Sequence, residues 1–199
     1  AVHRVLWRAG VTADFVAPGD DLSGYRLVLA PSLYLISDAD AESVRRYVDG
    51  GGHLMVWYFS GIVDQDAQVR TGGHPGAFRT VLGVRVEEFH PLAGPLPLAS
   101  GATGRTWSEH VHLTGAEAVD SYAAGPLAGL PAVTRNQHGA GTAWYVSTGL
   151  DDVDLAPLVA TAAAAAGVRS ALASATGAPH PDLPPDVEVV LRRRGADRW

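Results

Sequence analysis

The fold is decided by residues 54–76, which read LMVWYFSGIVDQDAQVRTGGHPG. The apolar run from Leu54 to Phe59 predicts a buried strand, and Ser60 and Gly61 break it and open a long polar loop. In α/β domains, the loop that follows the carboxyl end of a buried parallel strand commonly binds a ligand or a partner. The sequence therefore places the candidate functional site in this loop.

The segments before the loop alternate between helix and strand. Residues 25–30 are apolar and predict a buried strand, and Ser37 and Asp40 have the spacing of a capping box at the start of the next helix. Strand, helix and strand in this order predict a parallel sheet with right-handed crossovers. Residues 2–9 predict an earlier helix and residues 11–16 a strand, so the strand expected before that first helix is absent.

The segments after the loop predict a short helix, an antiparallel β insertion and a last helix. The short helix spans residues 76–82 and ends at Gly83, and residues 92–104, rich in Pro, Gly and Ala, predict a loop. Strand-like patterns then occupy residues 84–89, 106–113, 116–122, 132–137 and 142–147, with a hairpin turn at 138–141. The last helix covers residues 151–167.

Prolines and glycines separate the end of the chain from the rest. Residues 174–186 have the composition of a linker, and residues 187–192 predict a strand beyond it. We therefore expect an α/β domain at residues 1–173 that lacks its first strand, a linker at 174–186, and the start of a C-terminal β domain at 187–199. A missing strand leaves an unpaired sheet edge, which another chain can occupy.

The composition argues against several classes of protein. The chain has no cysteine, which excludes disulfides, thiolate metal sites and cysteine nucleophiles. Its net charge of −6 argues against general nucleic-acid binding, because contacts to phosphate need a positive field. No apolar run approaches the roughly 20 residues that span a bilayer, and residues 1–4 lack the basic-then-apolar order of a signal peptide. We expect a cytoplasmic protein that binds neither nucleic acid nor membrane.

The acidic and histidine residues form no recognisable catalytic or metal site in the sequence. Glu87 and Glu88 are adjacent on a predicted strand and point to opposite faces, so they cannot work as a carboxylate pair. His110 and His112 share a strand face, but the pattern offers no third ligand. The chain has no Gly-x-Ser-x-Gly elbow, and its strand-to-loop corner holds Ser60 where class I glutamine amidotransferases place a cysteine. We expect no catalytic residue, no metal and no cofactor.

Six stretches of the chain resemble the middle domain of glycoside hydrolase family 42 β-galactosidases, called the trimerisation domain. They cover residues 6–11, 14–16, 21–31, 33–35, 58–64 and 82–92, and the similarity runs to about residue 170. The resemblance implies a flavodoxin-like or class I glutamine amidotransferase-like fold, in which helices flank a parallel sheet. It also implies a homotrimer whose active-site clefts lie close to neighbouring subunits. In that family the two catalytic glutamates lie on a preceding (β/α)8 barrel, which this chain does not contain.

The resemblance therefore predicts a non-catalytic oligomerisation domain of a retaining β-galactosidase, whose parent barrel binds the galactoside. Its candidate residues for a cleft wall or a subunit contact are Tyr58, Phe59, Ser60, Asp64 and His74. Aromatic side chains suit both sugar stacking and interface anchoring, but strand alternation would turn Tyr58 and Phe59 to opposite faces, one of them core. Two alternatives stay open. One is a stand-alone α/β enzyme or small-ligand-binding domain that uses the carboxyl end of its own sheet, and the other is a domain that binds sugars weakly without catalysis.

Overall fold

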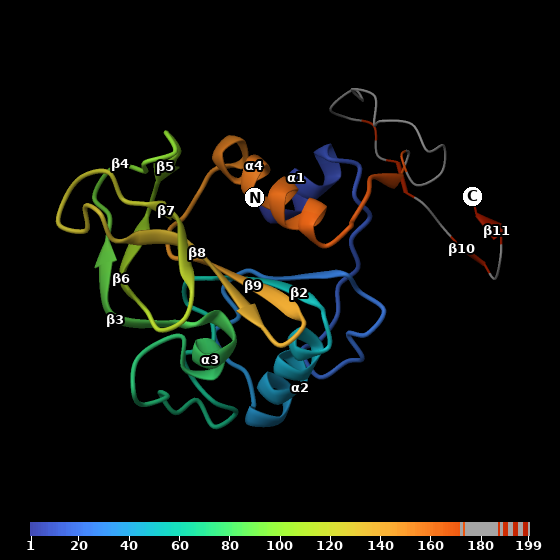
Figure 1. Ribbon diagram of the computed structural model, residues 1–199, viewed down its shortest axis with the longest axis horizontal. Coiled ribbons are helices and arrows are strands. Elements are labelled where there is room, and N and C mark those ends of the chain that lie inside the picture. Colours follow the sequence, from blue (N-terminus) through green and yellow to red (C-terminus); the bar gives the residue numbers. More distant parts are fainter. Residues whose placement is uncertain (172, 174–186, 188, 191–192, 195–196, 199) are drawn as a thin grey trace. The chain divides into compact units, whose positions relative to one another are not determined.

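The computed structural model of the chain divides into two compact units, one of residues 17–151 and one of residues 1–16 and 152–199 (Figure 1). The structure describes residues 1–171, 173, 187, 189–190, 193–194 and 197–198. The predicted linker at residues 174–186 lies outside the described residues, as does much of the predicted strand at 187–192. The described end of the chain holds a short antiparallel pair, β10 (Arg193–Arg194) and β11 (Asp197–Arg198).

The larger unit is built on a mixed sheet of five strands in the order β1-β2-β9-β8-β7. Parallel pairing joins β1 (Leu27–Ala30), β2 (His53–Trp57) and β9 (Gly141–Val146), and β8 (Pro131–His138) and β7 (Glu117–Ser121) continue the sheet in antiparallel orientation. The α/β class and the parallel pairing of β1 with β2 are confirmed. Strand β9, expected within an antiparallel insertion, instead pairs in parallel with β2, because it lies beside β2 on one side and β8 on the other. Part of the antiparallel region is continuous with the parallel strands, because β8 and β9 form a hairpin within the same sheet.

Helix α2 (Asp38–Asp49) packs on one face of this sheet (Figure 1). The Ser37 hydroxyl accepts the backbone N–H of Asp40 at 3.1 Å, which caps the first turn as the sequence predicts. Val44 and Val48 are one turn apart and both are buried against the apolar side chains of β2 and β9. Full burial of such a side chain is worth roughly 1.5–3 kcal/mol, so packing and the cap together hold the helix.

The hairpin between β8 and β9 approaches the end of α2 very closely. Gly139 has a φ of +57°, in the left-handed region that its tight turn requires. At Gly141, an added Cβ atom would lie 2.2 Å from the carbonyl oxygen of Gly52, so only glycine fits. This approach lets β9 pair with β2 from Thr142 to Val146.

The main hydrophobic core lies between this sheet, α2 and the segments that follow the long loop. Its buried members are Leu22, Ile36, Val44, Val48, Leu54, Val56, Phe78, Val81, Leu82, Val84, Val86, Val111, Ala143 and Tyr145. A second, smaller cluster holds Leu98, Tyr122, Leu127 and Ala132. The larger unit therefore has its own core, as an independently packed α/β domain requires.

Strands β3 (Val84–Pro91) and β6 (Trp107–Leu113) form a separate antiparallel sheet. The short helical segment η1 (Gly76–Phe78) and helix α3 (Arg79–Leu82) precede it, and the chain leaves α3 through Gly83 at a φ of +61°. The predicted short helix and its glycine stop are confirmed. This sheet carries the aromatic residues Phe89, on β3, and Trp107, on β6.

Two sequence predictions are wrong. Residues 92–104, expected to be a loop, contain the short paired strands β4 (Leu96–Pro97) and β5 (Thr103–Gly104). Residues 11–16, expected to be a strand, have no regular structure, and Phe15 is 89% exposed there. No described strand pairs with residues 11–16, and an apolar stretch without a neighbour cannot satisfy its backbone groups as a strand.

The smaller unit contains α1 (Val2–Arg8) and α4 (Asp152–Ala165), so both predicted helices are confirmed. The guanidinium groups of Arg4 and Arg8 lie 3.0 and 3.8 Å from the carboxylate of Asp152, which begins α4. Within the described part of the chain, no helix combines the length and the apolar character needed to cross a membrane.

Candidate functional site

The corner between β2 and the long loop is closed by Ser60. Phe59 and Gly61 both have left-handed backbone conformations, with φ values of +61° and +63°, and these end the strand abruptly. The side chain of Ser60 is fully buried between them. Its hydroxyl accepts the N–H of Leu33 at 3.0 Å and donates to the carbonyl of Ala30 at 3.4 Å. Ser60 therefore joins the carboxyl ends of β1 and β2, and its hydroxyl is occupied.

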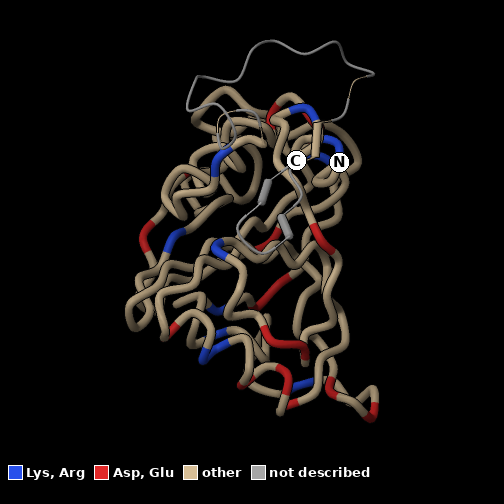
Figure 2. The backbone as a smooth tube through the Cα atoms, turned by 90° about the vertical axis from the view of Figure 1, so that its right-hand side faces the viewer, with Lys and Arg blue, Asp and Glu red and all other residues tan. Residues whose placement is uncertain are grey.

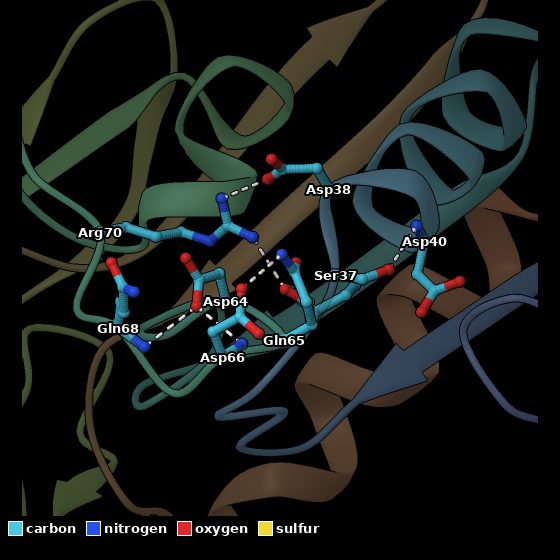
Figure 3. Close-up of polar contacts among 9 residues, drawn as sticks. Ser37, Asp38, Asp40, Asp64, Gln65, Asp66, Gln68 and Arg70 are labelled. Carbon is cyan, nitrogen blue, oxygen red and sulfur yellow. Dashed lines mark hydrogen bonds and ion pairs between the residues drawn. The ribbon is translucent and has the colours of Figure 1, made fainter.

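The first half of the loop is held by polar contacts (Figure 3). One carboxylate oxygen of Asp64 accepts the N–H groups of Asp66 and Gln68 at 2.9 and 3.0 Å, which folds the loop back on itself. The guanidinium of Arg70 pairs with Asp38 at 2.5 Å and donates to the carbonyl of Ile36 at 2.8 Å. The loop is therefore fastened to the N-terminus of α2.

The second half of the loop is fastened to β3. His74 and Val86 exchange two backbone hydrogen bonds, at 2.9 and 2.7 Å. The His74 ring stacks on Phe89 with 4.8 Å between the ring centroids. Burial, together with the nearby charge of Arg79, lowers the pKa of His74, so this imidazole is neutral at pH 7. A neutral ring stacks on an aromatic neighbour without a cost for burying charge.

Five half-buried aromatic side chains meet above this corner, and we call them the aromatic cluster: Tyr58, Phe59, His74, Phe89 and Trp107. Ring centroids are 4.2 Å apart for Phe59 and Trp107, 5.3 Å for Phe89 and Trp107, and 5.6 Å for Tyr58 and Phe59. The prediction that Tyr58 and Phe59 point to opposite faces is wrong. The positive φ of Phe59 breaks the alternation, so both rings lie on the same cluster.

The structure thus sorts the five predicted site residues into two groups. Tyr58, Phe59 and His74 come together in the aromatic cluster. Ser60 and Asp64 instead shape the corner and the loop through hydrogen bonds to backbone groups.

A buried carboxyl group, Glu109, lies next to the cluster and is fully inaccessible to solvent. One of its oxygens accepts the indole N–H of Trp107 at 3.1 Å, and the other accepts the hydroxyl of Tyr145 at 2.5 Å. Its backbone N–H donates to the hydroxyl of Tyr122 at 3.4 Å, and that hydroxyl lies 2.7 Å from the Ser147 hydroxyl. Burial raises the pKa of Glu109 to about 7, although the bonds from Tyr145 and Trp107 oppose the shift.

Sequence reasoning missed Glu109, Trp107 and Phe89. A signal for Glu109 does exist, since it alternates with Trp107 and Val111 on β6 and must share their face of the strand. A carboxylate between an indole and a buried valine is unusual enough to mark the position.

The other charged candidates lie on the outer surface of β3 and β6. The pairing of these strands is irregular between Val86 and Glu88, and both Glu87 and Glu88 are exposed. Glu87 contacts His112 at 3.1 Å. The rings of His110 and His112 stack at 4.4 Å, as expected for residues on one face. In the described residues, no group of three or more His, Cys, Asp or Glu side chains is arranged to hold a metal.

Charged residues of both signs are interspersed along the described chain (Figure 2). The excess of acidic residues gives the net charge of −6.

Residues 1–169 match the family model described as the β-galactosidase trimerisation domain. The chain belongs to this family. A β-galactosidase from Arthrobacter sp is 44% identical over 199 residues, which cover 99% of this chain and 27% of that protein. A β-galactosidase from Heyndrickxia coagulans is 37% identical over 202 residues, covering 99% of this chain and 29% of the relative. The resemblance to glycoside hydrolase family 42 is confirmed.

Solved structures agree with this assignment. The β-galactosidase of Bacillus circulans sp. alkalophilus superimposes with a TM-score of 0.88 at 30% identity, over 99% of this chain and 30% of that one. The β-galactosidase of Rahnella sp. R3 gives a TM-score of 0.82 at 32% identity, over 85% of this chain and 27% of that one. This trimerisation domain therefore spans less than a third of the length of these relatives.

Proposed function

We propose that the chain serves as the non-catalytic oligomerisation part of a homotrimeric β-galactosidase that hydrolyses terminal β-D-galactosides. The observation that carries this proposal is the family match over residues 1–169. The relatives are β-galactosidases more than three times as long, so the matched region is a minor part of each. In this proposal the barrel of the parent protein supplies the catalytic glutamates and binds the galactoside.

The described carboxylates support a non-catalytic role. A glycosidase needs two carboxyl groups facing each other across a sugar, roughly 5 Å apart or somewhat more. Glu87 and Glu88 are exposed and contact histidines, and Glu109 is sealed from solvent by its neighbours. At the carboxyl end of β2, the Ser60 hydroxyl is already bonded to Leu33 and Ala30, which disfavours the alternative of an enzyme acting there.

The proposal includes finer statements on fold and location. The parallel strands β1, β2 and β9 with α2 on one face suit a flavodoxin-like or class I glutamine amidotransferase-like architecture. We assign residues 1–173 to the domain, 174–186 to a linker and 187–199 to the next domain. We also place the protein in the cytoplasm.

We assign the subunit contact or cleft wall to the aromatic cluster and the loop below it. Half-buried aromatic side chains are the residue type that most often carries interface energy, and their faces also stack on sugars. The loop is held at both ends, by the Arg70–Asp38 pair and by the backbone bonds between His74 and Val86. A pre-ordered surface loses little entropy on association, which favours a contact role.

Sedimentation equilibrium of the 199-residue chain tests the proposal. We expect a trimer whose dissociation constant rises at least about tenfold in Tyr58→Ala or Phe89→Ala, which corresponds to about 1.4 kcal/mol. Val119→Ala, at an exposed position on β7, is the matched control and leaves the constant unchanged. A strict monomer at high concentration contradicts the assembly role. Turnover of a chromogenic β-galactoside by the pure chain that survives Glu87→Gln and Glu88→Gln contradicts the non-catalytic role.

A further inference from the structure

The buried carboxyl group of Glu109 links the aromatic cluster to the central strand of the sheet. Trp107 lies in the cluster and stands two residues from Glu109 on β6, and Tyr145 lies inside β9. Glu109 bonds to both at once, one oxygen to each. Because Tyr145 is buried in the main core, its bond anchors the carboxyl group to a rigid part of the unit.

We propose that Glu109 is a positioning residue, which holds Trp107 in the aromatic cluster through the indole N–H and holds it less strongly when the carboxyl group takes up a proton. Its relevance to subunit contact rests on the function proposed above. The hydrogen-bond arrangement itself does not.

The donors and acceptors around Glu109 match the ionised carboxylate. The indole of Trp107 can only donate, and the hydroxyl of Tyr145 donates its proton to the second oxygen. A proton added to the oxygen that faces Trp107 would oppose the indole N–H. A proton on the other oxygen is accommodated when Tyr145 reverses its hydroxyl and accepts it. Both bonds then remain, but the indole N–H of Trp107 now donates to a neutral oxygen, and the bond loses the charge assistance that makes such bonds roughly twice as strong.

The groups that surround Glu109 let this carboxyl group titrate near neutrality. Tyr145 on β9, Tyr122 after β7 and Tyr58 after β2 act on it or respond to its charge, and all three have raised pKa values. They therefore stay neutral while Glu109 titrates. Its partner across the β3 pairing is the apolar residue Phe89. On the flanking positions, His90 pairs with Glu88 and Arg105 pairs with Asp151.

Substitution by glutamine separates positioning from titration. In Glu109→Gln, the amide oxygen can still accept the Trp107 N–H and the amide nitrogen can donate to Tyr145. The variant therefore keeps the anchor without a group that titrates. Glu109→Met has similar length but accepts no strong hydrogen bond, so it removes the anchor at every pH.

The test follows the indole N–H resonance of Trp107 by two-dimensional ¹⁵N NMR in the 199-residue chain. The chain has five tryptophans, so Trp107→Phe identifies the peak by its disappearance. We expect the peak to shift with a midpoint near pH 7, where Glu109 titrates. In Glu109→Gln the shift is lost and the peak stays near its low-pH position, because a neutral amide oxygen accepts the N–H as the protonated acid does. In Glu109→Met the N–H has no acceptor, and the peak leaves both positions.

Matched controls exclude the nearby histidines as the source of the shift. His74→Gln in the cluster and His90→Gln beside it should both leave the midpoint unchanged. Tyr145→Phe removes one donor to the carboxylate and should move the midpoint to higher pH, which also keeps the test decisive if Glu109→Gln fails to fold. A shift that persists in Glu109→Gln, or disappears in His74→Gln, overturns the proposal.

Sedimentation of the same samples separates this inference from the proposed function. A titrating Trp107 in a strict monomer supports the positioning role and contradicts the assembly role. A trimer whose Trp107 peak does not shift between about pH 5.5 and about pH 8.5 supports the assembly role and contradicts the positioning role. Glu109 would change protonation within that range.

Discussion

The parallel and the antiparallel halves of the larger unit treat buried polar groups differently. At the end of β2, in the parallel half, Ser60 is fully bonded and only closes a corner. In the antiparallel half, β6 and β8 bury Glu109, Thr134 and Asn136 among apolar side chains. The hydroxyl at the position where α/β domains usually bind ligands is therefore occupied, while the carboxyl group with a strongly raised pKa, Glu109, lies on the other half. The search at the carboxyl end of a strand did not find Glu109, whereas its burial in the structure identified it.

The largest expected effect concerns the stability of the chain against pH. Burial raises the pKa of Glu109 from 4.5 to about 7, so the folded state binds this proton more tightly than the unfolded chain. The unfolding free energy should therefore fall as pH rises from about 4.5 to about 7, by about 3 kcal/mol for a shift of this size.

Urea unfolding at a series of pH values gives the unfolding free energy of the unmodified chain and of Glu109→Gln. The difference between these two free energies measures the effect. The difference isolates Glu109 from the ionisable groups that the two proteins share. A constant difference across the range would mean that Glu109 does not change protonation there. The two effects would have opposite signs, because protonation of Glu109 stabilises the fold while it weakens the hydrogen bond to Trp107.

A smaller effect is expected at the corner that Ser60 closes. Ser60→Ala leaves the part-buried N–H of Leu33 without its acceptor, which should cost about 1 kcal/mol or somewhat more of unfolding free energy. Thermal or urea unfolding measures it. Thr80→Ala, at an exposed position on α3, is the control and should change stability by less than about 0.5 kcal/mol. Equal stability of Ser60→Ala and the parent chain would mean that the corner does not depend on the serine.

The smallest effect should have the opposite sign. The Thr134 hydroxyl on β8 is buried and bonds to no other group. Replacing it with the similarly shaped valine removes an unsatisfied polar group, so Thr134→Val should stabilise the chain by about 1 kcal/mol. The same urea experiment measures this gain, and a loss of stability would show that the hydroxyl has a partner, such as an ordered water.

The sequence predicted the parallel half well because its signals are local. The capped helix after Ser37 and the apolar strand from Leu54 each carry their own pattern, and both are confirmed. The predicted strand at residues 11–16 failed because a strand also needs a neighbour, which local pattern cannot supply. The shared face of Tyr58 and Phe59 depends on one positive φ at a bulky residue, and no sequence rule anticipates that conformation.

The sequence predicted only the residues of the candidate site that lie close together in the chain. Tyr58, Phe59 and His74 lie within one stretch of sequence, so a loop-centred prediction could include them. Phe89 and Trp107 join them from another sheet, through pairing of β3 with β6. Glu109 receives one of its two hydrogen bonds from Tyr145, 36 residues further along the chain. Contacts between residues so far apart in the chain depend on the tertiary fold, and the local sequence pattern does not predict them.

The strand order β1-β2-β9-β8-β7 has a consequence for the time course of folding. The pair of β1 and β2, and the antiparallel run from β7 to β9, each form from segments close together in the chain. The two halves join only when His53 meets Thr142, which closes a very long loop. Loop closure of this length is slow compared with hairpin formation. The pairing of β2 with β9 is thus the last to form, and until it does, the edge of β2 is open to pairing with another chain.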